Sequence, residues 1–275
     1  MNQLAPMTAR SFITLGEHRL AYQYEPAPNR LPMVLLHGMG GSSDSWTMLR
    51  RFFKSYYSLY ALDLPGHGAT PAGDKPISIR RNAQLVTAFI QHHGLERPIL
   101  VGHSMGAQIA VAATLWEQLS LQGLLLLAPA GIEAFSHQEA QWMLQGMDWL
   151  HGKTPPWLRQ WADASESAGL HSVKEAAGQD QLLMQCIRAM LQEPVHQELE
   201  AVRVPSLLIF GGDDRLIPNR MVHWRMTVSQ LARQQAGRIP KAAIRVLKQA
   251  GHFMHRTHPK SIFRQIQLQP WAQDL

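Results

Sequence analysis

Short runs of consecutive apolar residues, separated by stretches with helical periodicity, constrain the fold of this chain more than any other feature. Runs such as MVLL at 33–36 and ILV at 99–101 are apolar at every position instead of alternating with polar residues. Strands with this composition are typically buried on both faces, as in a parallel sheet covered by helices. The expected strands are residues 11–15, 20–24, 33–36, 57–62, 99–101, 121–127, 206–210 and 243–247.

These runs predict an α/β fold with a mostly parallel eight-stranded sheet flanked by helices. The first two strands are close enough to form a hairpin at Gly16 and Glu17. Ser78 is placed to cap a helix that ends near Gly94, and residues 105–119 are expected to form a second helix.

Residues 131–200 interrupt the alternation, because they contain helical stretches but no convincing strand. We expect a helical cap, or lid, inserted between two parts of one core, residues 1–130 and 201–275. The cap is rich in tryptophan and methionine, which at helical spacing are more often core than pocket, although a cap over an active site would use some of them for both. Its candidates for lining a substrate pocket are Trp142, Met143 and Met147, to which we add Phe253 from the core.

The chain of 275 residues has the length of one large α/β domain, and 45% of its residues are hydrophobic. It has no apolar run approaching the roughly 18–20 residues of a membrane span, and its first residues lack the pattern of a signal peptide. Cys186 is the single cysteine, which excludes an internal disulfide and fits a reducing compartment. We therefore expect a cytoplasmic protein.

The formal net charge of +6 is concentrated in residues 201–275, which hold 12 basic and 3 acidic residues. Seven of the basic residues lie in 220–248, where there is no acidic one. Such a surface can attract an acidic carrier protein, although a solvated face that merely raises the isoelectric point is the simpler explanation. No nucleic-acid-binding motif accompanies the charge, so we expect no nucleic-acid partner.

The sequence GHSMGA at 102–107 places Ser104 between two glycines, after a predicted strand and before a predicted helix. Strand, sharp turn and helix are the context in which a G-x-S-x-G motif exposes a nucleophilic serine. A serine hydroxyl is a weak nucleophile, so it needs a base, an acid that orients the base, and donors for the oxyanion.

Two later segments can supply the acid and the base. GGDDRLIP at 211–218 follows the strand 206–210, and we choose Asp214 over Asp213 as the acid. His252 follows the last predicted strand and is the candidate base. The order serine, aspartate, histidine is that of the strand–turn–helix hydrolases. Because all three residues follow strands, they should converge at one edge of the sheet.

The glycine-rich turn HGMGGSSDSW at 37–46 can aim backbone N–H groups at the same edge. We expect the amides of Met39 and Met105 to hold an oxyanion. His37 and His103 flank the turns that carry these amides and could tune the site, but local hydrogen bonds are the simpler expectation. The spacing of His252, His255 and His258 could suggest a metal site, but no Asp, Glu or Cys joins them, so we predict neither metal nor cofactor.

The series HGMGGSSDSW, DLPGHG (63–68), GHSMGA, GGDDRLIP and GHF (251–253) resembles the motifs of the α/β-hydrolase superfamily. More narrowly, the chain resembles its cap-bearing esterases and C–C hydrolases, over roughly residues 11–268. The resemblance implies the α/β-hydrolase fold, with Ser104, Asp214 and His252 as the catalytic triad. It also implies Met39 and Met105 as the oxyanion amides and DLPGHG as a structural turn.

We therefore expect a serine hydrolase that cleaves carboxylic esters with an apolar acyl or aryl group through an acyl-enzyme. One alternative is a C–C bond hydrolase of ring-cleavage products, and another is a thioesterase or esterase acting on a carrier-bound acyl chain. A non-enzymatic alternative is a ligand-binding receptor with this fold, a type that some plant hormone receptors resemble.

Overall fold

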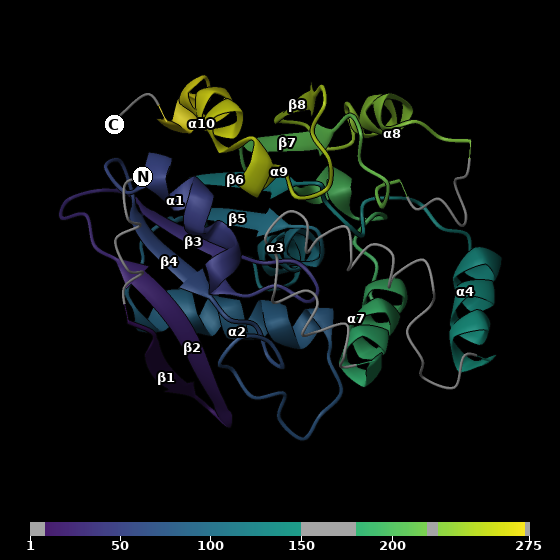
Figure 1. Cartoon of the computed structure of the whole chain (residues 1–275), viewed down its shortest axis with the longest axis horizontal. Coiled ribbons are helices and arrows are strands. Elements are labelled where there is room, and N and C mark those ends of the chain that lie inside the picture. The colour runs from purple at the N-terminus through teal and green to yellow at the C-terminus, as the bar shows by residue number, and fades with distance from the viewer. Residues whose placement is uncertain (1–8, 150–179, 219–224, 273–275) are drawn as a thin grey trace.

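The computed structural model describes residues 9–149, 180–218 and 225–272, which form one central sheet with helices on both faces (Figure 1). The sheet has eight strands in the order β1-β2-β4-β3-β5-β6-β7-β8. All eight coincide with the predicted apolar runs. Their bounds are β1 (Ser11–Leu15), β2 (His18–Glu25), β3 (Pro32–Leu36), β4 (Ser58–Leu62), β5 (Ile99–His103), β6 (Gly123–Leu127), β7 (Ser206–Gly211) and β8 (Ala242–Leu247).

The sheet is mostly parallel, as predicted. β3 pairs in parallel with β4 and β5, and the parallel pairing continues through β6 and β7 to β8. At the other edge, β1 pairs antiparallel with β2, and β2 pairs antiparallel with β4. The hairpin between β1 and β2 turns at Gly16, whose φ of 58° lies in the left-handed region that glycine adopts without strain.

Helices cover both faces of the sheet, which explains why its central strands β3, β5, β6 and β7 lack polar alternation. In β3, Val34 and Leu36 belong to one core while Met33 and Leu35 belong to the other, and all four are fully buried. The first face carries α2 (Ile79–His92), α3 (Met105–Trp116) and α8 (Val228–Gln235), and the second carries α1 (Thr47–Phe53), α9 (Met254–Thr257) and α10 (Pro259–Gln267). Short 3₁₀ turns occur at η1 (Ser43–Trp46), η2 (Leu199–Ala201) and η3 (Pro270–Ala272).

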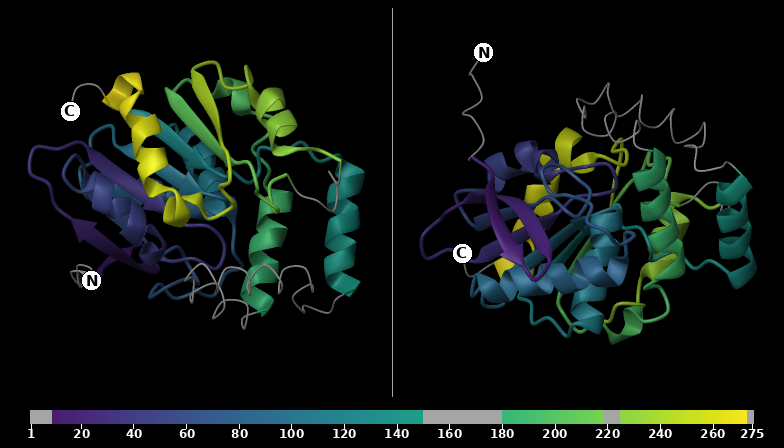
Figure 2. Two further views of the ribbon diagram at one scale, coloured as in Figure 1. Left: turned by 45° about the horizontal axis from the view of Figure 1, so that its top comes forward. Right: turned by 90° about the horizontal axis from the view of Figure 1, so that it is seen from below.

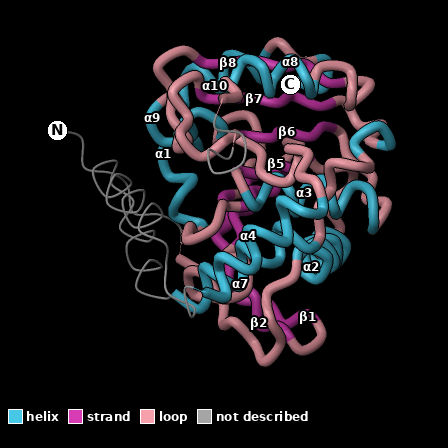
Figure 3. Tube along the Cα trace, turned by 90° about the vertical axis from the view of Figure 1, so that its right-hand side faces the viewer, coloured by secondary structure: helices cyan, strands magenta, loops and turns pink. Residues whose placement is uncertain are grey.

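The described part of the segment 131–200 lies beyond one end of the sheet (Figure 1) and contains α4 (His137–Trp149), α7 (Asp180–Gln192) and no strand. In both views of Figure 2, α7 lies between α4 and the core, and Figure 3 shows the molecule from the side on which these helices lie. Trp157 and Trp161, two further tryptophans of the predicted cap, lie outside the described residues. No helix in the described part of the chain is long and apolar enough to cross a membrane.

Polar contacts attach the C-terminal end of α7 to the core. The amide nitrogen of Gln108, on α3, donates to the carbonyl oxygens of Met190 and Glu193 at 3.0 and 2.9 Å. The Glu193 carboxylate accepts in turn from the Ser78 hydroxyl and the Arg80 N–H, at the start of α2. Buried donors and acceptors are costly to leave unpaired, so these bonds favour one fixed position of α7 on the core.

The middle of α7 contacts the DLPGHG turn. Leu182 packs closely against Gly66: a Cβ added to Gly66 would lie 2.7 Å from Cδ1 of Leu182. The Cys186 thiol lies 4.0 Å from Nε2 of His67. This turn is itself organised by Asp63, whose carboxylate accepts from the N–H groups of Ser43 and Ala69.

Candidate active site

Ser104 lies at a sharp turn between β5 and α3. Its φ of 52° and ψ of −118° are a conformation that residues other than glycine rarely adopt. The surrounding backbone holds it there: the Ser104 N–H donates to the Leu127 carbonyl at 3.0 Å, and the Ser104 carbonyl accepts from Ala107 at 2.9 Å. Strained backbone of this kind persists only where the surrounding structure enforces it, and it is concentrated at functional sites.

The two glycines of GHSMGA are required by close backbone packing. A Cβ on Gly102 would lie 2.4 Å from Cα of Ala107, and a Cβ on Gly106 would lie 2.2 Å from the Leu36 carbonyl oxygen. Both separations are far below van der Waals contact, and the atoms in the way are backbone atoms that cannot rotate aside. The glycines therefore allow α3 to start directly beside β3, which brings Ser104 to the carboxyl edge of the sheet.

Asp214 and His252 form a direct hydrogen bond. Nδ1 of His252 lies 2.9 Å from Oδ2 of Asp214, and both side chains are buried. The other carboxylate oxygen of Asp214 accepts from the N–H groups of Leu216 and Ile217 at 2.8 and 3.0 Å. Because a carboxylate only accepts, Nδ1 carries the proton of the neutral imidazole and Nε2 presents a lone pair.

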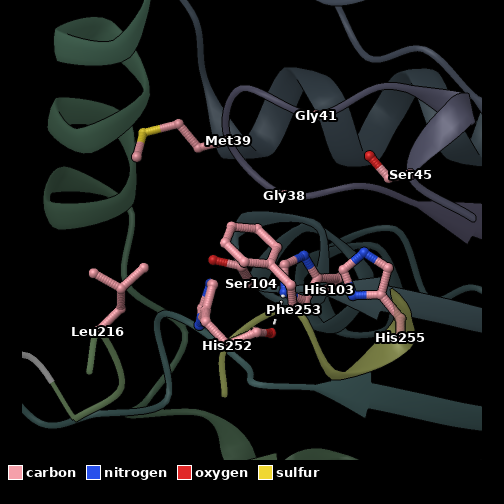
Figure 4. Close-up of a pocket in the computed structure, with 10 residues that line it drawn as sticks. All are labelled: Gly38, Met39, Gly41, Ser45, His103, Ser104, Leu216, His252, Phe253 and His255. Carbon is pink, nitrogen blue, oxygen red and sulfur yellow. Dashed lines mark hydrogen bonds between the residues drawn. The ribbon is translucent and has the colours of Figure 1, made fainter. Parts of the chain in front are cut away.

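One pocket brings Ser104 and His252 together (Figure 4). Asp214 lies behind His252, while its neighbour Asp213 is exposed. Apolar side chains from three separate loops form part of the wall, and backbone of the HGMGGSSDSW loop forms another part. The pocket is lined by Gly38, Met39, Gly41, Ser45, His103, Ser104, Leu216, His252, Phe253 and His255.

The two predicted oxyanion amides come from the segments that flank this pocket. Met105 is the first residue of α3, so its N–H has no carbonyl partner within the helix. Met39 lies in the loop after β3 and lines the pocket. His37 holds this loop in place: its Nδ1–H donates to the Gly38 carbonyl at 2.8 Å, and its Nε2 accepts from the Leu64 N–H at 3.0 Å.

Two more histidines line the pocket and are buried. Burial, with the neighbouring His255 and His252, lowers the pKa of His103 well below its usual value. Burial, with the neighbouring Arg256 and His252, lowers the pKa of His255 to about 3. Both rings are therefore neutral near pH 7. Neither ring nitrogen of His255 has a hydrogen-bond partner among the described residues, whereas His258, the third histidine of the series, bonds to the hydroxyl of Thr257.

A family model described as the alpha/beta hydrolase family matches residues 33–265. The chain belongs to the alpha/beta hydrolase family. The eight-stranded, mostly parallel sheet flanked by helices is the corresponding fold, and it confirms the expectation drawn from the motif series.

Three relatives illustrate the range of proteins that this alpha/beta hydrolase resembles. Uncharacterized hydrolase YugF of Bacillus subtilis is 25% identical, with 89% of this chain and 92% of the relative covered. The (E)-2-((N-methylformamido)methylene)succinate hydrolase of Acinetobacter baylyi is 24% identical, covering 93% and 95%. A solved structure of a thermophilic esterase from Thermogutta terrifontis superposes with a TM-score of 0.77 and is 18% identical, with 97% of this chain and 99% of the esterase covered. At this identity the likeness shows the fold alone.

The cap residues predicted to line a pocket of this alpha/beta hydrolase have different positions. Trp142 is 57% exposed on α4, Met143 is buried, and neither lines the pocket around Ser104. The side chain of Met147 lies outside the described residues. Phe253 does line the pocket, with its ring beside Ser104 and His252 in Figure 4.

Sequence reasoning missed Leu216 and the roles of His103 and His255 in the pocket wall of the alpha/beta hydrolase. Leu216 carries no chemical signal, but its position two residues after Asp214 places it beside the site. The expectation of a local hydrogen bond was wrong for His103, which bonds to a residue 149 positions away. For His37 it holds at Nδ1 only, because Nε2 reaches Leu64.

Proposed function

We propose that this protein is a serine hydrolase that cleaves carboxylic esters, with Ser104 as nucleophile, His252 as base and Asp214 as the acid that orients it. The single observation that carries the proposal is the pocket in which the strained Ser104 meets a histidine bonded to a buried carboxylate. A base with a fixed imidazole tautomer and a paired acid are the parts that activate a hydroxyl, and strained backbone is concentrated at functional sites.

In the proposed reaction Nε2 of His252 removes the proton of Ser104 Oγ while that oxygen attacks the ester carbonyl carbon. The Asp214 carboxylate, 2.9 Å from Nδ1, stabilises the imidazolium that forms. His252 then gives the proton to the leaving alcohol oxygen, which leaves an acyl group on Ser104. A water molecule, deprotonated by His252, attacks this acyl-enzyme and releases the carboxylic acid.

The negative charge on the carbonyl oxygen needs donors that are already in position. The N–H groups of Met39 and Met105 are the proposed donors, since they lie in the loop after β3 and at the start of α3. One such donor contributes on the order of 10²–10³ in kcat in other hydrolases. A backbone donor keeps its N–H when its side chain is replaced, so only the main-chain geometry controls this contribution.

The pocket wall favours an apolar group on the substrate. Leu216, Phe253 and the Met39 side chain provide apolar surface, and the described lining contains no Lys, Arg, Asp or Glu side chain. Transfer of apolar surface from water to such a wall is favourable, by roughly 25 cal/mol for each Å². An apolar acyl or aryl ester therefore suits the site better than a charged one.

We further propose that residues 131–200 act as a cap over this site, inserted between core parts 1–130 and 201–275. The helical character of the described part and its position beyond one end of the sheet support this division. The contacts of α7 with α2, α3 and the DLPGHG turn make α7 the fixed side of the cap.

Hydrolysis of p-nitrophenyl esters with acyl chains from two to twelve carbons tests the proposal. Wild-type protein should turn over at least some of these esters, and Ser104→Ala should lower kcat by on the order of 10⁴–10⁶. Ser120→Ala is the matched control, because Ser120 is exposed and outside the pocket. Absence of Ser104-dependent turnover at every chain length would exclude a simple esterase and leave the C–C hydrolase, the carrier-bound acyl substrate and the receptor as alternatives.

Two alternative substrates use the same residues and belong in the same assay. A vinylogous ketone from ring cleavage tests the C–C hydrolase alternative, and a carrier-bound thioester tests the acidic-carrier alternative. For the latter, reversing the charges of Arg233, Arg238 and Lys241 should raise KM for the carrier-bound substrate only. Equal effects on a free ester would eliminate the carrier. The carrier and the cytoplasmic location both remain predictions.

A further inference from the structure

The side chain of His103 connects the segments that supply the proposed nucleophile and the proposed base. His103 is the last residue of β5 and directly precedes Ser104. Its Nε2 lies 2.9 Å from the main-chain carbonyl oxygen of His252, a contact drawn as a dashed line in Figure 4. The two residues are 149 positions apart in the chain, one at the end of β5 and the other in the loop after β8.

The direction of this hydrogen bond follows from its acceptor. A carbonyl oxygen only accepts, so Nε2 of His103 must carry the proton. The ring is 3% exposed, and its burial among His252 and His255 opposes a second proton, so it stays neutral. The tautomer of His103 is thereby fixed as Nε2–H, with the lone pair on Nδ1.

The ring of His103 is held by contacts on several sides. Its centroid lies 4.3 Å from that of His255 and 5.7 Å from that of Phe253. A Cβ added to Gly38 would lie only 2.9 Å from Nδ1 of His103. The ring therefore fills the space between the loop after β3 and the loop after β8, and it has little freedom to rotate.

The loop that carries His252 is bonded to the loop after β7 just before the His103 contact. The Ala250 carbonyl accepts from the Asp213 N–H at 2.9 Å. Gly251, the next residue, is not packed closely, because a Cβ added there would have no atom within 4 Å. Asp214 fixes the His252 ring, but it bonds to the side chain and not to the main chain. The His103 bond is directed at the main chain of His252 itself.

We propose that His103 is a positioning residue, which sets the His252 imidazole relative to Ser104 by holding the His252 carbonyl with its Nε2–H. The inference rests on the proposed esterase function of the same pocket. His103 is covalently attached to Ser104 and bonds to the main chain of His252. One side chain therefore fixes the position of the proposed base relative to the proposed nucleophile. Proton transfer needs these groups within hydrogen-bond reach, and a displacement of about 1 Å can cost about 10²-fold in rate.

Two substitutions of His103 separate the hydrogen bond from simple filling of space. His103→Phe keeps a ring of similar shape and removes the donor, whereas His103→Gln keeps an N–H donor at about the same distance from Cβ. Ester hydrolysis by His103→Phe should show kcat lowered about 10- to 100-fold with KM changed less than about threefold. His103→Gln should recover a large part of the lost kcat.

His67→Phe is the matched control, because His67 is also a buried neutral histidine but lies in the DLPGHG turn and outside the pocket. It should lose stability, as measured by thermal unfolding, without the selective loss of kcat. If His103→Phe fails to fold, His103→Asn replaces it, since the shorter amide loses the contact with the His252 carbonyl.

The outcomes distinguish this inference from the proposed function. No Ser104-dependent turnover by the wild type would remove the esterase function and the inference with it. Normal wild-type turnover with an unchanged kcat in His103→Phe would overturn the inference alone. So would an equal loss of kcat in His103→Phe and His103→Gln, or a loss confined to KM, because neither result depends on the donor.

Discussion

His252 Nδ1 and Asp214 Oδ2 lie 2.9 Å apart, although the two residues are 38 positions apart and follow different strands of the sheet. The other oxygen of the carboxylate is occupied by the N–H groups of Leu216 and Ile217. The two oxygens of Asp214 therefore have different roles, because Oδ1 anchors the loop and Oδ2 orients the imidazole.

This division predicts the effect of Asp214→Asn. The amide oxygen should replace Oδ1, because Leu216 and Ile217 donate there, so the NH₂ group faces His252 and disfavours the Nδ1–H tautomer. We expect kcat for ester hydrolysis to fall about 10⁴-fold, with little change in fold by circular dichroism. Asp213→Asn, at the exposed neighbouring position, should retain wild-type kcat. The reverse result would identify Asp213 as the acid.

Gly106, two residues after Ser104, predicts a loss of stability on substitution. In Gly106→Ala the new Cβ would lie 2.2 Å from the Leu36 carbonyl oxygen, so α3 must move away from β3. We expect the free energy of unfolding to fall by about 3 kcal/mol or more in urea titrations. Gly251→Ala is the control: it meets no atom within 4 Å and should be neutral or stabilising by about 0.4–1 kcal/mol. Equal effects of the two substitutions would show that backbone contact does not explain the motif.

Buried neutral histidines predict that acid weakens the fold. Burial lowers the pKa of His67 and of His255 to about 3, whereas an unfolded histidine titrates near 6.5. Between these pH values the two imidazoles are protonated in the unfolded chain but stay neutral in the folded chain. The free energy of unfolding should therefore fall as pH decreases below about 6.5. Each such residue contributes up to about 1.4 kcal/mol for each pH unit.

Urea unfolding between about pH 7 and pH 5 measures this slope. His255→Phe and His67→Phe should each reduce it by about one proton, and the double variant by about two. Slopes that match the wild type in all three variants would mean that these rings are protonated in the folded protein.

The single cysteine predicts a probe for the position of α7. Cys186 is fully buried and its burial raises the pKa of the thiol to about 12, so the reactive thiolate is scarce in the folded protein. We expect an aromatic disulfide reagent to label Cys186 only when α7 leaves the core. Gln108→Leu removes the donors to Met190 and Glu193 and should speed labelling about 10-fold. Gln91→Leu, at an exposed position of α2, should label at the wild-type rate. Rapid labelling of the wild type would show that α7 is not stably packed on the core.

The strands could be predicted from the sequence because burial on both faces leaves continuous apolar runs. The differences are confined to the ends: β2 starts at His18 instead of residue 20, and β6 at Gly123 instead of residue 121. The pairing of Asp214 with His252 also followed from the sequence, since residues after parallel strands meet at one edge. Physical regularity of the sheet made both predictions possible.

The pocket wall could not be predicted in the same way. Helical spacing shows that Trp142 and Met143 lie on neighbouring faces of α4, but it does not say which face meets a cavity, and Trp142 is mostly exposed. The bond from His103 to the His252 carbonyl leaves no mark in the sequence, because every residue has such a carbonyl. Contacts to main-chain atoms across a fold are invisible until the loops are placed.

The residues that attach α7 to the core differ from the residues that line the pocket around Ser104. The attachment of α7 and the pocket wall can therefore change independently. The polar bonds of α7 go to α2 and α3, and Leu182 and Cys186 contact the DLPGHG turn; none of the residues that make these contacts lines the pocket. These attachments and the strained serine turn are made by described residues outside the chain between α4 and α7. In the proposed cap, substrate preference can then change by exchange of that chain, while the proposed reacting groups Ser104, Asp214 and His252 are inherited unchanged.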